Sequence, residues 1–417
     1  MSRSSGSRKL CVIVSAVVAG LLTPLVSFTQ SDFHVTFGTT GDLNNTDTAT
    51  RIVETDRGDI VVAGTGASHF SDDGIENRTI PLVARFNANG ELQWQRVFTE
   101  LENHRMAALL SEGEDQYFLL QGERVSGNLA SPVTLRRIDE NGELSGAILT
   151  LEGFYGATVI PVSEEDLAHF LITAKRGSTR QAASAANQEL FKLDLQGQIT
   201  DLQLPSGVNS TRHLRYLGER EMLLVPPWRG SSGVSVNPET YEMRWDFLRL
   251  SEDGKSSFLF SLINKSCWII EVSRDRVFCA QSTSHPPGSN ELAIVAYTMT
   301  GDESWRHDLP IDHDPPALLL PLGSGELLYL ERHRKDATAV RISGTGEVVS
   351  RQDIRSTGEY TFINAIEELK DGRLAFAGST GPWGPYVSRD TDAMLIVMGA
   401  SGDIEETPKV NSYIMRH

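Results

Sequence analysis

The stretch Arg85-Phe86-Asn87-Ala88-Asn89-Gly90-Glu91-Leu92 places a polar turn with a glycine between apolar residues. The chain repeats this pattern at 137–144 and at 192–199, and further copies centre on Gly254, Gly301, Gly346 and Gly402. The six intervals in the 312 residues between Gly90 and Gly402 average 52 residues. A fixed period of this size predicts a repeat architecture rather than a series of unrelated domains.

Each repeat contains four short segments of strand length, which in the first repeat are 49–53, 60–64, 82–86 and 92–98. Turn residues separate them and no helical period is present, so each repeat is predicted to be a four-stranded antiparallel meander. Such a sheet buries little by itself, but sheets arranged radially pack on one another. The sequence predicts an all-β fold, a seven-bladed β-propeller of four-stranded antiparallel blades, as one domain over residues 33–417. A linear β-solenoid or two smaller propellers are the alternatives.

The last repeat matches the first closely, since residues 368–378 align with 54–64 at an offset of 314. Two segments compete for the fourth strand of this last blade. Phe33–Gly38 stands before the first repeat and has strand character, and 404–410 follows the last turn. Either segment, or both side by side, could close the ring.

The amino terminus has the composition of an export signal. Arg3, Arg8 and Lys9 precede an apolar run from Leu10 to Phe28, and no acidic residue occurs before Asp32. We interpret residues 1–29 as a signal peptide or an N-terminal membrane anchor. The protein is therefore predicted to be exported, to the periplasm or the extracellular space, with no membrane span after this segment.

The net charge and the absence of catalytic motifs exclude several classes of function. The formal net charge is −17, which argues against nucleic acid as a partner because such binding needs clustered Lys and Arg. No G-x-S-x-G, H-E-x-x-H or Walker motif is present, and no cofactor is predicted. Asp312-His313-Asp314 lies in a proline-rich connection and is interpreted as a solvated loop rather than a metal site.

The repeat resembles those of bacterial exported β-propeller proteins, with the pattern Gly-x-hydrophobic-hydrophobic-x-Ala-Gly, a long loop, and then Asn/Asp-x-x-Gly-x-hydrophobic-x-Trp. The turn followed by Trp94 and by Trp305 is also distantly similar to the tryptophan-docking repeat of quinoprotein-type propellers. The resemblance covers residues 45–410 and implies the fold. It does not imply a specific role, because propellers host many functions.

Cys267 and Cys279 flank the turn Val272–Arg274 on two predicted adjacent strands. If Glu271 faces Asp275, then Cys267 faces Cys279 directly. An exported compartment permits disulfides, so the pair is predicted to be oxidised.

The second loop of each repeat is long and differs from blade to blade, whereas the first and third turns are short. In a meander these long loops share one edge of the ring, and variable loops on one edge often form a binding face. We predict ligand contacts there for five residues: Trp228, Arg229, His285, Trp383 and Tyr386. The sequence favours a non-catalytic binding or scaffold module for an unknown protein, peptide or glycan. The alternative is an enzyme (hydrolase, lyase or quinoprotein-like) with an active site assembled from several blades at the channel mouth.

Overall fold

The computed structural model describes residues 32–40, 47–66, 79–101, 103–122, 131–164, 167–177, 187–205, 208, 213–226, 244–283, 291–310, 316, 318–333, 336–355, 360–381, 391–399 and 410–416. Residues 31–417 form one compact unit. The predicted signal or anchor, residues 1–29, lies outside the described residues, as does Asp312–Asp314. No helix in the described ranges has the length and apolar character needed to cross a bilayer.

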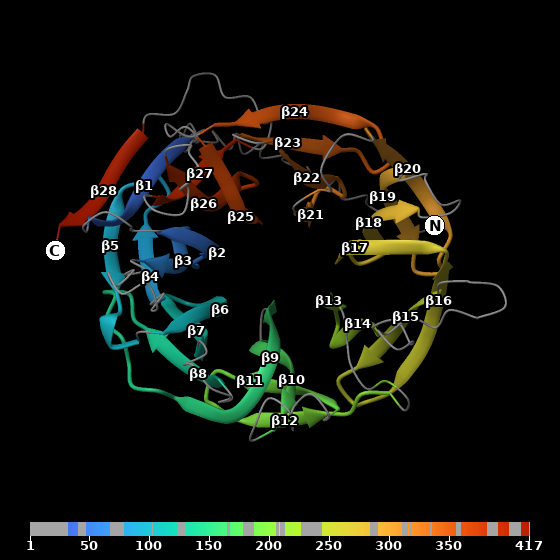
Figure 1. Ribbon diagram of the computed structural model, residues 1–417, viewed down its shortest axis with the longest axis horizontal. Helices are drawn as coiled ribbons and strands as arrows, with labels where there is room; N and C mark the ends of the chain where they lie inside the picture. The colour runs from blue at the N-terminus through green and yellow to red at the C-terminus, as the bar shows by residue number, and fades with distance from the viewer. Residues whose placement is uncertain are drawn as a thin grey trace, which may run out of the picture. The chain divides into compact units, whose positions relative to one another are not determined.

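Within this unit seven blades follow one another around a central channel (Figure 1), and they form six sheets because blades 2 and 3 are joined in one seven-stranded sheet. Four of the blades, numbered 1, 4, 5 and 6, each consist of four antiparallel strands that follow one another in the chain. Blade 1 contains β2 (Thr48–Glu54), β3 (Ile60–Gly66), β4 (Ile80–Phe86) and β5 (Leu92–Val97). Blade 4 contains β13 (His213–Gly218), β14 (Glu221–Val225), β15 (Arg244–Ser251) and β16 (Ser256–Ile263). Blade 5 contains β17 (Lys265–Val272), β18 (Arg276–Thr283), β19 (Glu291–Thr298) and β20 (Glu303–Leu309), and blade 6 contains β21 (Leu319–Pro321), β22 (Leu327–Arg332), β23 (Ala337–Ile342) and β24 (Val348–Ile354).

Blades 2 and 3 share one long strand. Blade 2 has β6 (His104–Glu112), β7 (Asp115–Gly122), β8 (Ser131–Ile138) and the first part of β9 (Leu149–Glu164). The second part of β9 is the innermost strand of blade 3, followed by β10 (Leu167–Arg176), β11 (Gln188–Asp194) and β12 (Ile199–Leu202). A short 3-10 turn, η1 (Thr99–Leu101), connects blades 1 and 2. The predicted seven-bladed fold is confirmed.

Blade 7 closes the ring with both ends of the chain. It contains β25 (Tyr360–Glu368), β26 (Leu374–Gly381) and β27 (Asp392–Met398). The amino-terminal strand β1 (Phe33–Thr40) pairs antiparallel with β27 and takes the fourth place. The carboxy-terminal strand β28 (Val410–Arg416) then pairs parallel with β1 as a fifth strand. The amino-terminal segment Phe33–Gly38 therefore takes the fourth place, whereas of the competing segment 404–410 only Val410, the first residue of β28, lies within the described residues.

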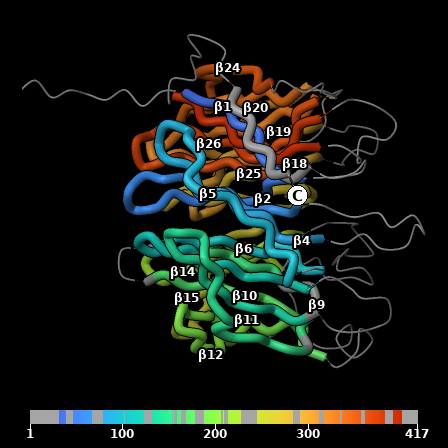
Figure 2. The backbone as a smooth tube through the Cα atoms, turned by 90° about the vertical axis from the view of Figure 1, so that its left-hand side faces the viewer, coloured from blue at the N-terminus to red at the C-terminus, as the bar shows by residue number. Residues whose placement is uncertain are grey.

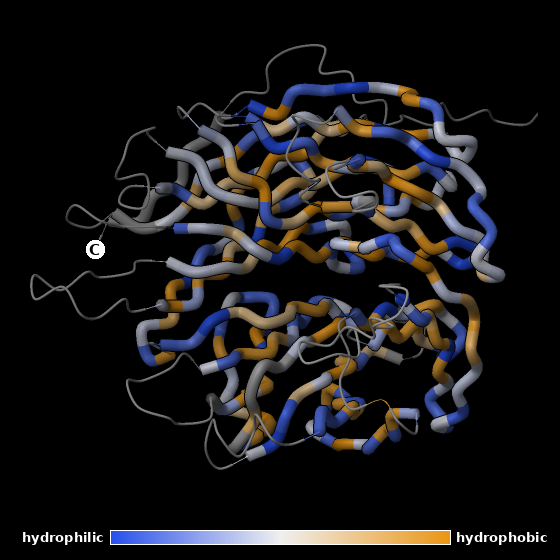
Figure 3. The backbone as a smooth tube through the Cα atoms, turned by 45° about the vertical axis from the view of Figure 1, so that its right-hand side comes forward, coloured by the Kyte–Doolittle hydropathy of each residue, from blue (hydrophilic) through white to orange (hydrophobic). Residues whose placement is uncertain are grey.

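Packing between the blades explains why the second strands are continuously apolar. All four residues of Ile60–Ala63 are fully buried. Seven hydrophobic clusters occur among the described residues, and each combines side chains of two neighbouring blades. Apolar stretches lie on strands inside the unit, whereas many hydrophilic stretches lie along its outside (Figure 3). Because no cluster belongs to one blade, a single blade has no core of its own.

A bulge at the same position of the innermost strand recurs in four blades. The extra residue is Thr50 in β2, Ala107 in β6, Trp268 in β17 and Asn364 in β25. At these bulges the inner strand approaches the second strand closely. A Cβ placed on Gly378 would lie 1.8 Å from the Phe362 carbonyl oxygen, and one placed on Gly64 would lie 1.9 Å from the Thr48 carbonyl oxygen. The Ala-Gly end of the repeat pattern is thus a packing requirement.

The tryptophan that follows the third turn docks on the next blade. The ring of Trp94 in blade 1 would meet a Cβ on Gly142 of blade 2 at 2.8 Å, and Trp305 of blade 5 has the same relation to Gly346. Trp94 also donates its indole N–H to the Glu140 carbonyl at 2.8 Å. Two other junctions use a phenylalanine: Phe33 lies against Gly90 and Phe260 against Gly301.

Cys267 and Cys279 form a disulfide with their Cα atoms 5.5 Å apart. The predicted register, however, is wrong. Glu271 faces Phe278, Cys267 faces Gln281, and Cys279 faces Ile270. The tighter turn and the bulge at Trp268 shift the strands, so the bridge joins diagonal rather than directly opposed positions.

Candidate functional site

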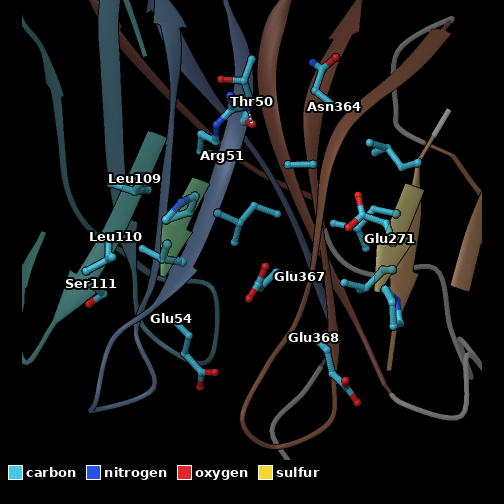
Figure 4. Close-up of a pocket in the computed structure, with 18 of the residues that line it drawn as sticks. Thr50, Arg51, Glu54, Leu109, Leu110, Ser111, Glu271, Asn364, Glu367 and Glu368 are labelled. Atoms are coloured by element: carbon cyan, nitrogen blue, oxygen red, sulfur yellow. Dashed lines mark hydrogen bonds between the residues drawn. The ribbon is translucent and has the colours of Figure 1, made fainter. Parts of the chain in front are cut away.

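A cavity of about 580 Å³ opens within the central channel. Its walls come from six innermost strands or the segments next to them: β2, β6, β9, β17, β21 and β25. Figure 4 shows charged side chains gathered in it. The lining residues that carry formal charge are Arg51, Glu54, Glu271, Glu367, Glu368 and Lys370.

These charges concentrate toward the edge with the short turns. Glu54 ends β2 and Glu368 ends β25, and each strand then enters a tight turn, Thr55–Asp59 or Leu369–Arg373. The long second loops join the other ends of the strands, such as Gly66 and Ile80 of blade 1. The charged floor of the cavity is therefore at the edge of the short turns, opposite to the ends that the long loops join. The strands β2 and β25, which carry Glu54 and Glu368, lie side by side in the ring (Figure 2).

The guanidinium of Arg51 in blade 1 is hydrogen-bonded to the backbone of blade 2. Its Nε and Nη2 donate to the Ala107 carbonyl at 3.1 and 2.8 Å, and its Nη1 donates to the Thr50 carbonyl at 2.6 Å. Burial, with a smaller contribution from Arg105, lowers the pKa of the Arg51 guanidinium. Because backbone carbonyls carry no formal charge, this cation is held in place but not neutralised.

Glu54 and Glu368 repeat one contact at consecutive junctions. Glu54 Oε2 accepts the backbone N–H of Lys370 in blade 7 at 2.5 Å, and Glu368 Oε2 accepts the backbone N–H of Gly323 in blade 6 at 2.6 Å. Lys370 Nζ in turn donates to the Thr55 carbonyl at 3.1 Å and to Asp56 at 3.0 Å. Burial raises the pKa of Glu54, against the lowering effect of the Lys370 N–H. These two carboxylates fasten turns of adjacent blades.

Glu271 forms an ion pair with Arg215 of the neighbouring blade. Arg215 donates Nε to Oε2 and Nη2 to Oε1, both at 2.8 Å, so the pair is bidentate. Burial nevertheless raises the pKa of Glu271, with Arg215 acting in the opposite direction. Two-point contact of this kind fixes both side chains and satisfies the carboxylate.

Glu367 is different, because no hydrogen bond or ion pair joins it to any other described residue. Figure 4 shows its carboxylate inside the cavity, between the sides formed by β2 and β25. The amide of Asn364, three residues earlier, donates instead to Thr48 Oγ1 at 2.9 Å and to the Ala49 carbonyl at 3.0 Å. Burial, followed by the negative charges of Glu54 and Glu368, raises the pKa of Glu367 to about 7. An acid with a raised pKa in a cavity is a candidate for ligand contact.

The five residues predicted from the long loops, Trp228, Arg229, His285, Trp383 and Tyr386, all lie outside the described residues. Sequence reasoning did not identify Glu367 or Glu271 as site residues. The signal available was the acidic pair Glu367-Glu368 at the end of an inner strand, aligned through Glu368 with Glu54. Among the described residues no group of three or more His, Cys, Asp or Glu side chains is arranged to hold a metal ion.

No protein-family model and no curated protein matches the sequence. The fold is similar to solved propellers at low identity. A virginiamycin B lyase from Staphylococcus aureus is 11% identical, with a TM-score of 0.47 over 86% of this chain and 98% of that chain. YCF48 from Cyanidioschyzon merolae is 8% identical, with a TM-score of 0.48 over 86% and 96%. A putative 6-phosphogluconolactonase from Bacteroides uniformis is 12% identical, with a TM-score of 0.43 over 73% and 84%. These likenesses do not decide between a binding module and an enzyme.

Proposed function

We propose that the protein is an exported, non-catalytic binding module whose central cavity receives a cationic group of its ligand. The observation that carries the proposal is Glu367, a carboxylate inside the cavity without a partner among the described residues. The lining residues carry four carboxylates against Arg51 and Lys370. Arg215 offsets one of these carboxylates through Glu271. A primary ammonium or a guanidinium would supply the missing donor and compensate the buried charge.

The first test is binding of simple amines, with hexylamine and agmatine as ligands in isothermal titration calorimetry. Glu367→Gln is expected to weaken binding by about 10- to 100-fold, because a hydrogen bond to a charged partner contributes about 1.5–3 kcal/mol. Binding to the native protein should also weaken as the pH falls below about 7, since Glu367 takes up a proton there while an aliphatic amine stays charged.

The matched control is Glu152→Gln, which changes an exposed carboxylate on β9 and should bind like the native protein. Failure of the native protein to bind either amine, or equal binding by Glu367→Gln, would overturn the proposal.

The same carboxylate also has a measurable effect on stability. A carboxyl whose folded pKa is raised above its unfolded value of 4.5 destabilises the protein above the folded pKa. This penalty disappears as the pH falls from about 7 to about 4.5. Glu367→Gln is therefore expected to increase the free energy of unfolding by about 1–3 kcal/mol near pH 8 and to leave it nearly unchanged near pH 4. Urea unfolding of both proteins at the two pH values measures the difference. An equal effect at both values would contradict the assignment.

A macromolecular partner is proposed to dock at the edge with the long second loops, through Trp228, Arg229, His285, Trp383 and Tyr386. Trp and Arg are enriched at recognition hot spots, and this edge is the one opposite to Glu367. Trp228→Ala and Trp383→Ala are the variants that test this docking once a protein, peptide or glycan is found to bind. N-terminal sequencing of the exported protein tests whether residues 1–29 are removed.

An enzyme is the second candidate, because a carboxyl with a pKa near 7 suits a general acid or base at neutral pH. Glu367 would then transfer a proton to or from a substrate in the cavity. Turnover that follows a pKa near 7 and disappears in Glu367→Gln would favour the enzyme over the binding module.

A further inference from the structure

Trp268 is an unusually exposed aromatic residue for an innermost strand. It is 46% exposed, and it is the extra residue of the bulge in β17. Phe362 of β25 is also exposed, but the guanidinium of Arg332 lies 4.1 Å from the centre of its ring. No comparable ring or cation contact involves Trp268 within the described part of the chain. Almost half of its surface is therefore left uncovered.

The bulge position indicates that Trp268 faces the channel outside the lining of the cavity itself, to which β17 contributes Glu271. Thr50 and Asn364 occupy the same bulge position in blades 1 and 7, and both line the cavity. Cys267 directly precedes Trp268, and its disulfide to Cys279 ties β17 to β18. The backbone that presents the indole is thus held by a covalent bond.

The strand register gives the depth of Trp268 relative to the carboxylates. Asn364 precedes Glu367 by three residues, and Trp268 precedes Glu271 by three residues. At about 3.3 Å per residue, Trp268 lies about 10 Å nearer the long-loop edge than the level of Glu271 and Glu367. The channel therefore presents an aromatic side chain at one depth and a group of carboxylates at another.

We propose that Trp268 is a second contact for the ligand of this cavity, and that the ligand is a linear primary amine or guanidine carrying a planar ring about 10 Å along the chain from its cationic group. The proposal rests on the proposed function, since Glu367 binds the cation. Stacking covers the indole face, which otherwise remains in contact with water, and aromatic pairs gain additional energy from their offset geometry. Charge complementarity between the ammonium and the acidic floor sets the orientation, with the ring toward the long-loop edge.

The experiment compares phenylhexylamine with hexylamine on the full chain by isothermal titration calorimetry. The two ligands share the ammonium and the aliphatic chain and differ only in the ring. The native protein is expected to bind phenylhexylamine about fivefold or more tightly. Trp268→Ala is expected to abolish this preference without changing hexylamine binding, and Trp268→Phe is expected to restore most of it. Ile263→Ala, which changes an exposed residue on the outer strand β16, is the matched control and should retain the preference.

The outcomes separate this inference from the proposed function. Hexylamine binding that depends on Glu367, together with an unchanged preference for phenylhexylamine in Trp268→Ala, would show that Trp268 is not a ligand contact. The cation site at Glu367 would then still be supported. If neither amine binds the native protein, both are wrong. A preference lost equally in Ile263→Ala would place the ring outside the channel and would also overturn the inference. Thermal unfolding of each variant verifies that it is folded.

Discussion

Gly378→Ala is expected to destabilise the propeller by about 3 kcal/mol or more, which is a large fraction of the stability of a typical domain. The added Cβ would lie 1.8 Å from the carbonyl oxygen of Phe362 and 2.8 Å from its carbonyl carbon. These are backbone atoms, so no side-chain rotation relieves the overlap. The strands β25 and β26 would have to separate, and their hydrogen bonds at this level would be lost.

The cause is the bulge at Asn364, which pushes the inner strand toward its neighbour. Blade 1 repeats the arrangement, so Gly64→Ala is expected to act in the same way through the Thr48 carbonyl at 1.9 Å. Gly146→Ala is the matched control, because no atom lies within 4 Å of a Cβ at that exposed position. Urea unfolding monitored by circular dichroism measures all three variants. A loss in Gly378→Ala no larger than that in Gly146→Ala would mean that the bulge can straighten at little cost.

Gly378 belongs to the part of the fold that could be predicted from the sequence alone. The recurrence of the Ala-Gly pattern and of the turn glycines was sufficient to predict seven four-stranded blades, because each glycine marks a fixed place in the meander. Gly90 and Gly142, for example, both have φ of +81° in the third turn of their blades. Local turn chemistry of this kind is legible in a sequence, because it depends on residues close together in the chain.

Register and docking partners were less predictable, since each depends on where an extra residue is inserted. The bulge at Trp268 shifted the pairing of Cys267 and Cys279. In blade 4 the extra residue of the outer strand is Leu259, opposite the pair Phe247 and Leu248, and the docking residue is Phe260, six residues after Gly254. A search for an aromatic residue four residues after the glycine finds Phe258, which is 56% exposed. Periodicity does not show where such insertions fall.

The candidate site was not predictable because its members are far apart in the chain. Glu54 and Glu367 meet in one cavity only because β1 pairs with β27 and closes the ring. The raised pKa of Glu367 depends on burial and on the charges of Glu54 and Glu368, and of these causes residues 360–370 alone show only Glu368. The five long-loop residues, in contrast, were predicted from their residue types and from their place on one edge of the ring. Their contacts with a ligand stay a prediction.

Trp94→Ala is expected to lower the free energy of unfolding by about 3–5 kcal/mol, the usual cost of truncating a buried aromatic residue. Trp94 is 8% exposed and fills the junction between blades 1 and 2, where its ring lies against Gly142. Truncation removes this packing and also leaves the Glu140 carbonyl without the indole N–H that it accepts at 2.8 Å. Trp268→Ala is the control, because that indole is 46% exposed and surface changes usually alter stability by less than about 0.5 kcal/mol.

The conservative variant Trp94→Phe separates packing from the hydrogen bond. Phe33 and Phe260 dock on the equivalent glycines of other junctions without an indole N–H, so a phenylalanine at 94 has a precedent in the same ring. We expect Trp94→Phe to lose only about 1–2 kcal/mol, the sum of one hydrogen bond and a small cavity. Equilibrium urea unfolding of the three variants decides the question. If Trp94→Phe is as damaging as Trp94→Ala, the hydrogen bond to Glu140 rather than ring-on-glycine packing holds blades 1 and 2 together. If Trp94→Ala is as stable as Trp268→Ala, the docked tryptophan is not a structural element of the ring.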